Sequence, residues 1–207
     1  VEARNLSRHA LTLTSGDVDV RPFVLGLIAF ATTMRNQLRG RPRDEGLDGL
    51  LPDEVIARLQ SARFAPTLVL LWLGQWLRGV REAGHLGPML AQHMERSVDE
   101  LSAALGGCER IANTPLPYPY VYFPRLFITL FCLIVPVGLV ESLGWFTPLA
   151  STVVGFMLLA IERIGTDLQS PFRFSEHQIQ MDTICETIER NLESMQREAQ
   201  CAEAVDA

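Results

Sequence analysis

Two long apolar runs, separated by two residues, constrain the fold of this chain more than any other feature. Residues 126–140 (LFITLFCLIVPVGLV) and 143–161 (LGWFTPLASTVVGFMLLAI) carry no charge, and only Glu141 and Ser142 lie between them. A helix of about 20 apolar residues spans a bilayer core of about 30 Å. The second run is long enough by itself. The first is long enough if it begins near Tyr120 and Arg125 extends toward the lipid headgroups. The pair predicts a transmembrane helical hairpin with a very tight turn.

A buried helical hairpin in a soluble protein is the alternative interpretation of the same residues. The membrane interpretation is favoured because core helices seldom continue this far without a polar face. Pro136 and Pro148 lie inside the runs. Proline would break a helix in water, whereas neighbouring helices in a membrane tolerate it as a kink.

Arginine placement predicts the orientation of the hairpin. The flanks carry Arg110, Arg125, Arg163 and Arg173, and the turn carries no arginine. By the positive-inside rule, both flanks are expected in the cytoplasm and the turn outside. The predicted fold is therefore an all-α membrane protein with three parts: a cytoplasmic helical bundle (1–119), a transmembrane helical hairpin (120–162) and a cytoplasmic C-terminal segment with an amphipathic helix (163–207).

The bundle is predicted from shorter apolar patterns. Residues 23–31 (FVLGLIAFA) are too few to span a membrane, and residues 64–77 (FAPTLVLLWLGQWL) include Gln75, so both are expected to be core helices. Pro52 before two acidic residues predicts a helix start. One apolar stripe on a further helix is predicted from residues spaced by three or four, and Gly106-Gly107 is expected to interrupt or end that helix. The stripe comprises Leu90, Met94, Val98, Leu101 and Leu105.

The last predicted element is an amphipathic helix starting at Ser175, which forms a capping box with Gln178. It must bury its apolar stripe against the bundle or a neighbouring subunit. The stripe comprises Met181, Ile184, Cys185, Ile188, Leu192 and Met195. By composition, residues 41–49 (RPRDEGLDG) are expected to be an exposed loop.

Charge and composition exclude several classes of function. The net charge of −6 argues against nucleic acid as a general partner. No phosphate-binding glycine loop or nucleophile elbow is present. The histidines and cysteines match no metal or redox spacing, so we expect no enzyme activity and no cofactor. These residues are His9, His85, His93, His177, Cys108, Cys132, Cys185 and Cys201.

Three prolines in five residues lie just before the first apolar run, at Pro115, Pro117 and Pro119. Proline fixes φ and removes a backbone donor, so we expect a stiff, extended connector at the cytoplasmic mouth instead of a helix. It is either a linker or a pore constriction. In the second case Leu116, flanked by Thr114, Pro115 and Pro117, projects into a pore, where a ring of apolar side chains can gate by dewetting.

Glu162 and Asp167 are weak candidates for a cation site where the chain leaves the second run. A calcium ion requires six to eight oxygen ligands, so a solvated helix end is the favoured interpretation. No other metal site is expected.

Several segments together resemble bacterial bestrophins, in the same order along the chain. Residues 107–111 (GCERI) and 114–118 (TPLPY) resemble the segment that leads into the membrane, and residues 140–145 (VESLGW) resemble the membrane hairpin. Residues 167–172 and 185–192 (CETIERNL) are similar to the C-terminal region of these proteins. Residues 1–6 and 81–84 are similar to segments that lie earlier in them.

The resemblance implies a homopentamer around one axial pore, conducting small ions without chemistry in the bacterial plasma (inner) membrane as a multi-pass protein. Family members pass chloride, and bacterial members can prefer cations. The family has two earlier membrane helices that include the pore neck, and we expect the chain to lack them. Leu116 matches the family's second constriction. Gln169 and Ser170 replace acids of the eukaryotic calcium clasp, which predicts no calcium gating of that type.

The expected partners are therefore further copies of the chain, permeating ions and the lipid bilayer. The alternative function is a non-conducting, membrane-anchored helical scaffold whose bundle binds a cytoplasmic partner. An enzyme with a membrane hairpin is weaker, because no catalytic set is present.

Overall fold

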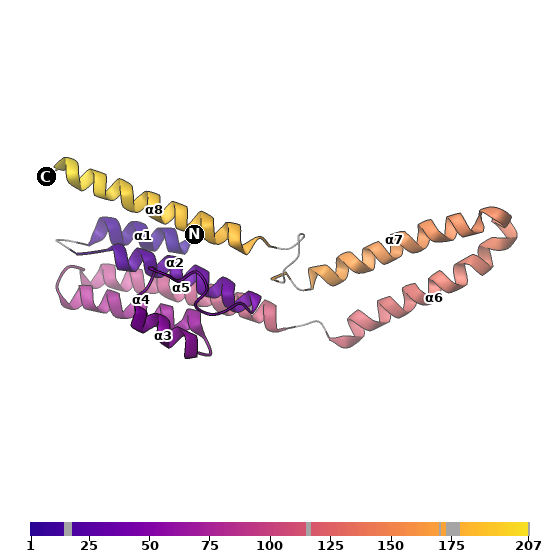
Figure 1. The fold of residues 1–207 in the computed structure, drawn as a ribbon, viewed down its shortest axis with the longest axis horizontal. Coiled ribbons are helices and arrows are strands. Elements are labelled where there is room, and N and C mark those ends of the chain that lie inside the picture. The colour runs from indigo at the N-terminus through magenta and orange to yellow at the C-terminus, as the bar shows by residue number, and fades with distance from the viewer. Residues whose placement is uncertain (15–17, 115–116, 170, 173–178, 207) are drawn as a thin grey trace. The chain divides into compact units, whose positions relative to one another are not determined.

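The computed structural model describes residues 1–14, 18–114, 117–169, 171–172 and 179–206, with side chains as far as Cys201. Every regular element in these ranges is a helix, which confirms the all-helical prediction for the described residues (Figure 1). The chain divides into two compact units, one of Val1–Arg110 with Gln180–Ala207 and one of Ile111–Ile179. The elements are α1 (Glu2–Leu13), α2 (Arg21–Arg39), α3 (Asp53–Ser61), α4 (Ala65–Glu82), α5 (Pro88–Asn113), α6 (Tyr118–Leu143), η1 (Gly144–Phe146), α7 (Thr147–Leu168) and α8 (Met181–Asp206).

The first unit is a helical bundle built around α2, which packs against α1, α4 and α8. The predicted core helix at 23–31 lies inside α2, where ten residues are buried. The second predicted core helix corresponds to α4, which buries one face and leaves Leu71 about half exposed. The largest fully buried side chains come from all parts of the bundle and include Leu6, Phe23, Leu27, Leu73, Met94 and Leu192.

A close approach between α2 and α4 fixes the centre of this core. The Phe23 and Trp76 rings stack with centroids 4.6 Å apart. At Gly26, a Cβ atom would lie 2.5 Å from Cζ3 of Trp72 and 2.9 Å from Cδ2 of Leu73. Packing therefore favours glycine here, because any larger residue would have to displace the Trp72 and Leu73 side chains.

Helix α5 is longer than the sequence predicted. Four residues of its predicted stripe are buried, namely Met94, Val98, Leu101 and Leu105. The expected interruption at Gly106-Gly107 is wrong, because the helix continues to Asn113. Glycine costs a helix only about 1 kcal/mol relative to alanine. A hydrogen bond between Gln37 on α2 and Glu109, beyond the glycine pair, joins this part of α5 to the bundle.

The loop after α2 was expected to be exposed, and the structure corrects this in part. Gly40 ends α2 in the left-handed conformation, with φ of 65°. Leu47 is nevertheless fully buried in the core. Asn36 Nδ2 donates to the carbonyl of Glu45 over 2.8 Å, which holds the loop against α2. The other residues of 41–49 are mostly polar or glycine, so composition alone did not predict that Leu47 is buried.

Helix α8 packs in the same unit as α1 and α2 (Figure 1). It begins at Met181, whereas the predicted capping residues Ser175 and Gln178 lie outside the described residues. Met181 and Leu192 of the predicted stripe are buried, but Ile184 is about half exposed. Cys185, Ile188 and Met195 are half-buried, so the stripe faces the bundle along its length and Ile184 lies at its exposed edge.

Candidate membrane hairpin and pore segment

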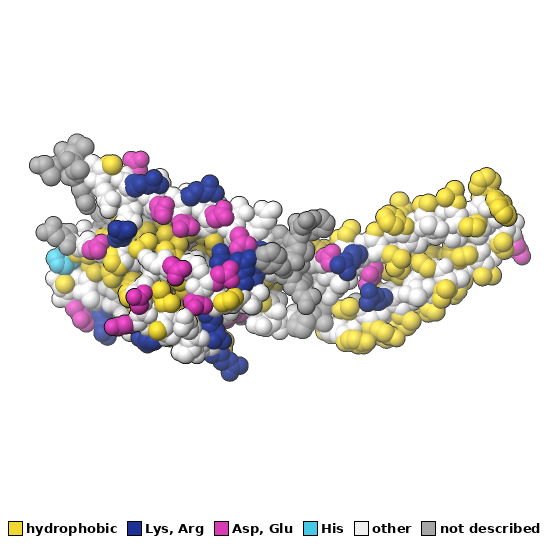
Figure 2. Space-filling model, in the orientation of Figure 1, with side chains coloured by type: hydrophobic (Ala, Val, Ile, Leu, Met, Phe, Trp, Pro, Cys, Tyr) yellow, Lys and Arg dark blue, Asp and Glu magenta, His cyan; other side chains and the backbone are white. Residues whose placement is uncertain are grey.

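The second unit contains α6, η1 and α7, which together form a helical run, Tyr118–Leu168, long and apolar enough to cross a membrane. At about 1.5 Å per residue, α6 is roughly 39 Å long and α7 roughly 33 Å. None of the residues of α6 is buried, and Thr147 is the buried residue of α7. Hydrophobic side chains cover the visible face of both helices (Figure 2). An apolar surface of this size is typical of a segment that meets lipid or other protein.

The turn of the hairpin lies three residues later than the sequence predicted. Helix α6 continues through Glu141 and Ser142 to Leu143, and η1 makes the turn. Gly144 has φ of 50° and ψ of −118°, a conformation that strongly favours glycine. Pro148 was expected to kink a helix, but it lies in the first turn of α7. Backbone N–H groups there have no partner within the helix, so proline breaks no hydrogen bond.

Four threonine hydroxyls of α6 and α7 are bonded within the hairpin. The hydroxyls of Thr129, Thr152 and Thr166 each donate to the carbonyl four residues earlier. Thr147 donates across the turn to the carbonyl of Leu139 over 3.4 Å. Such bonds satisfy polar groups in an apolar setting, where water is absent.

Opposite charges face each other at the ends of α6 and α7 that lie away from the turn. Arg125 Nε is 3.4 Å from Glu162 Oε1, and Thr166 also donates to that carboxylate. Arg163 pairs with Asp167 at 3.5 Å. Each of the two candidate carboxylates thus lies against a guanidinium. Among the described residues, no group of three or more His, Cys, Asp or Glu is placed to hold a metal ion.

The candidate constriction lies between α5 and α6. Helix α5 ends at Asn113, Thr114 is exposed, and Pro117 is the exposed residue that precedes α6. The break between helices fits the proline argument, although α6 begins at Tyr118 and takes Pro119 into its first turn. Leu116 and Pro115 lie outside the described residues. The pore-lining role of this segment therefore stays a prediction.

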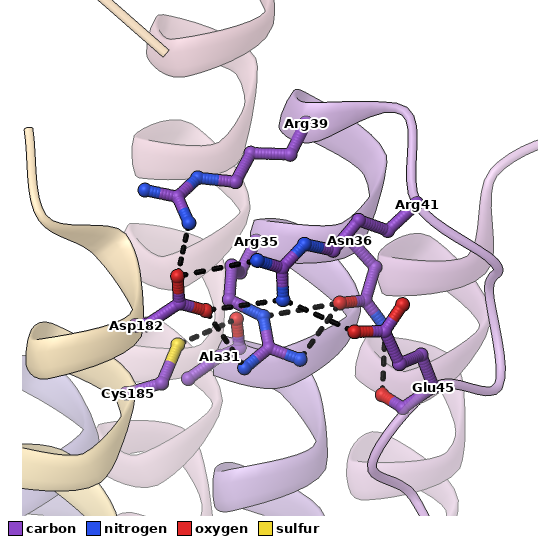
Figure 3. Close-up of polar contacts among 8 residues, drawn as sticks. All are labelled: Ala31, Arg35, Asn36, Arg39, Arg41, Glu45, Asp182 and Cys185. Carbon is purple, nitrogen blue, oxygen red and sulfur yellow. Dashed lines mark hydrogen bonds and ion pairs between the residues drawn. The ribbon is translucent and has the colours of Figure 1, made fainter. Parts of the chain in front are cut away.

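A cluster of arginines and acids attaches α8 to α2, and sequence reasoning missed it (Figure 3). The Asp182 carboxylate accepts from Arg39 and pairs with Arg35 at 3.3 Å and with Arg41 at 3.2 Å. Cys185, one turn later, lies 3.5 Å from the carbonyl of Ala31, and burial raises the pKa of its thiol. Arg35 and Arg39 are four apart on α2, but no pattern in the sequence pointed to Asp182 as their partner.

Two histidines that looked unrelated in the sequence lie together in the bundle. The rings of His9 on α1 and His93 on α5 have centroids 4.9 Å apart. His9 is almost fully buried, and Arg8 contacts its Nε2 at 2.8 Å. Burial, followed by the charges of Arg8 and His93, lowers the pKa of His9 below its ordinary value.

The family model for bacterial and fungal bestrophins matches residues 1–194. The chain belongs to this bestrophin family. The resemblance predicted from ordered segments such as GCERI and TPLPY is thereby confirmed, and it extends across both units of the fold. Bestrophin relatives of known structure share this helical architecture. A bacterial bestrophin homologue from Klebsiella pneumoniae is 31% identical with a TM-score of 0.89, covering 94% of this chain and 72% of its own.

Curated bestrophin relatives carry names that state an activity. A voltage-dependent anion channel-forming protein of Ralstonia nicotianae is 38% identical over 91% of this chain and 62% of its own length. The voltage-dependent anion channel-forming protein YneE of Escherichia coli is 32% identical over 97% of this chain and 66% of its own length. The chain thus spans somewhat less than two thirds of the length of these relatives.

Proposed function

We propose that this bestrophin is a subunit of a homopentameric channel that conducts small anions through a central pore. The observation that carries the proposal is the exposed apolar hairpin of α6 and α7, which needs lipid or neighbouring subunits around it. The names of the curated relatives support an anion as the permeating species. In such a channel, lipid would cover one face of the hairpin and neighbouring copies of the chain the other. A soluble monomer would expose both faces to water.

The hairpin is proposed to cross the bacterial plasma membrane with its turn outside. Arg125 and Arg163 lie at the ends of α6 and α7 away from η1, whereas η1 carries no charge and the last turn of α6 before it carries Glu141 and no arginine. The positive-inside rule then leaves the bundle and the C-terminus in the cytoplasm. Residues 1–119, 120–162 and 163–207 are the corresponding bundle, membrane and C-terminal parts.

Leu116 is proposed to form the constriction at the cytoplasmic mouth, held between Pro115 and Pro117. Leu116→Ala should raise single-channel conductance or alter anion selectivity, because a shorter apolar ring opposes wetting less. The measurement is current through the purified protein in planar bilayers, with reversal potentials in a chloride gradient. Met89→Ala removes an apolar side chain of the bundle that is 86% exposed, and it should leave currents unchanged. Identical currents in Leu116→Ala would exclude the side chain from the constriction.

Stoichiometry and flux separate this function from a membrane-anchored scaffold. Mass measurement in detergent should give five copies, and chloride efflux from liposomes should exceed that of empty ones. A pentamer that supports no flux of anions or cations, and that retains a cytoplasmic protein on purification, would favour the scaffold.

A further inference from the structure

The bundle contains a polar cavity of about 590 Å³ between the end of α2, the loop that follows it and the end of α3. This volume lies within the range of small-molecule sites. Three guanidiniums, three amides and one carboxylate provide its charged and amide lining, from Arg41, Arg43, Arg63, Asn36, Gln37, Gln60 and Asp44. The lining therefore presents hydrogen-bond donors in excess of acceptors, which suits an anion.

Among the described residues, the lining and the groups bonded to it carry more positive than negative charge. Asp44 accepts from Gln60 over 2.8 Å, and Arg43 donates to the Gln60 carbonyl over 3.0 Å. Arg41 contacts Glu45 at 3.1 Å and Asp182 at 3.2 Å. Within the described part of the chain, five guanidiniums and four carboxylates line the cavity or belong to the groups bonded around it. The guanidiniums are those of Arg35, Arg39, Arg41, Arg43 and Arg63, and the carboxylates those of Asp44, Glu45, Glu109 and Asp182.

In the neighbouring cluster, Arg41 of the cavity already binds an oxyanion, the Asp182 carboxylate of α8, together with Arg35 and Arg39 (Figure 3). Arg35 and Arg39 hold it from one side, and their side chains are only 14% and 7% exposed. Arg41 reaches it with both terminal nitrogens, over 3.2 and 3.3 Å. Asp182 therefore acts as a tethered anion, and Arg41 belongs both to its site and to the cavity.

We propose that this cavity binds a phosphate group of a small molecule or a lipid, through Arg41, Arg43 and Arg63. A guanidinium matches two phosphate oxygens with two parallel N–H donors, and its charge persists at any physiological pH. The cavity lies beside the Asp182 site, so a phosphate there competes with Asp182 for Arg41. Occupancy thus weakens the attachment of α8 to α2, because Asp182 loses one of its three guanidiniums.

The direct test is titration calorimetry of the detergent-purified protein with inorganic phosphate, in a buffer of constant chloride. Arg43→Gln combined with Arg63→Gln should weaken phosphate binding by roughly tenfold or more, because each lost charge-assisted hydrogen bond is worth that factor. Arg190→Gln removes an exposed guanidinium elsewhere in the same unit and should bind phosphate as the parent does. Equal affinity of the double variant and the parent would overturn the site.

The competition with Asp182 predicts a change in phosphate affinity that would not occur if these arginines had only a structural role. Asp182→Asn removes the tethered anion, and phosphate should then bind several-fold more tightly. Glu45→Gln, which removes the charge of a second carboxylate in contact with Arg41, should act in the same direction if the first variant fails to fold. Unchanged or weaker binding in the folded variants would refute the sharing of Arg41.

A second arm identifies the source of the phosphate group. Phosphatidic acid doped into the micelles should displace inorganic phosphate if a lipid headgroup fits the cavity, and should leave it bound if only a free anion fits. Failure of the parent protein to bind either probe overturns the proposal. Neither readout depends on ion conduction, so this result stands apart from the proposed channel function.

Discussion

Gly26 decides how closely α2 and α4 approach, because an added Cβ would lie 2.5 Å from a Trp72 ring atom. We expect Gly26→Ala to lower the free energy of unfolding by about 1 kcal/mol. An overpacking cost of about 1–3 kcal/mol outweighs a gain in helix propensity of about 1 kcal/mol. Thermal unfolding of the detergent-purified protein, followed by circular dichroism, measures the change.

Gly79→Ala is the matched control, since Gly79 lies on α4 with nothing within 4 Å of an added Cβ. It gains helix propensity without a clash and should raise stability by up to about 1 kcal/mol. If both alanine variants shift stability in the same direction, packing at Gly26 is not what limits this core.

The lowered pKa of His9 predicts that acid destabilises the bundle. The pKa of His9 is lowered in the folded state, so its stabilising contribution is complete above the ordinary value of 6.5. As pH falls from 6.5 toward the lowered folded value, the unfolded state binds more protons and stability declines. Unfolding midpoints between neutral and mildly acidic pH should show this decline. His9→Gln should flatten it, whereas His85→Gln should not. An unchanged slope in His9→Gln would assign the decline to other groups.

At the scale of elements, one ion pair joins the two helices of the hairpin. Glu162 is only 13% exposed, so removal of Arg125 leaves a carboxylate with little access to water. Arg125→Gln should therefore destabilise the hairpin more than Arg125→Gln combined with Glu162→Gln. A double-mutant cycle in mixed micelles should give a coupling of about 0.5–3 kcal/mol, the usual range for contacting residues. A coupling of zero would mean that the ion pair contributes nothing to the stability of the hairpin.

Helix types were easier to predict than helix ends. Apolar runs predicted α2 and α4, and residue spacing predicted the stripe of α5, whereas Gly106-Gly107 did not end α5 and Pro148 did not kink α7. Glycine within a helix costs only about 1 kcal/mol. The effect of proline depends on its position, and in the first turn it is well tolerated. Tertiary contacts such as that between Gln37 and Glu109 can override a preference of that size.

At the scale of the whole molecule, the apolar hairpin predicts dependence on surfactant. Residues of α6 such as Phe127, Leu133 and Val137 are each more than two thirds exposed. Dilution below the critical micelle concentration should aggregate the protein, because apolar surface of this extent associates in water. Size-exclusion chromatography with light scattering checks this. A monodisperse species without surfactant would contradict both the membrane hairpin and the channel proposal.

The sequence by itself determined the helical class, the apolar hairpin and the family, because each of these depends on local composition, periodicity or ordered strings. Only the tertiary structure decided which distant residues meet: Asp182 with the arginines of α2, His9 with His93, and Leu47 with the core. Such pairs are separated by tens of residues or more, and a single sequence carries no signal for contacts at that range. These residues meet only because the helices that carry them pack in the bundle, where α2 lies against α1, α4 and α8.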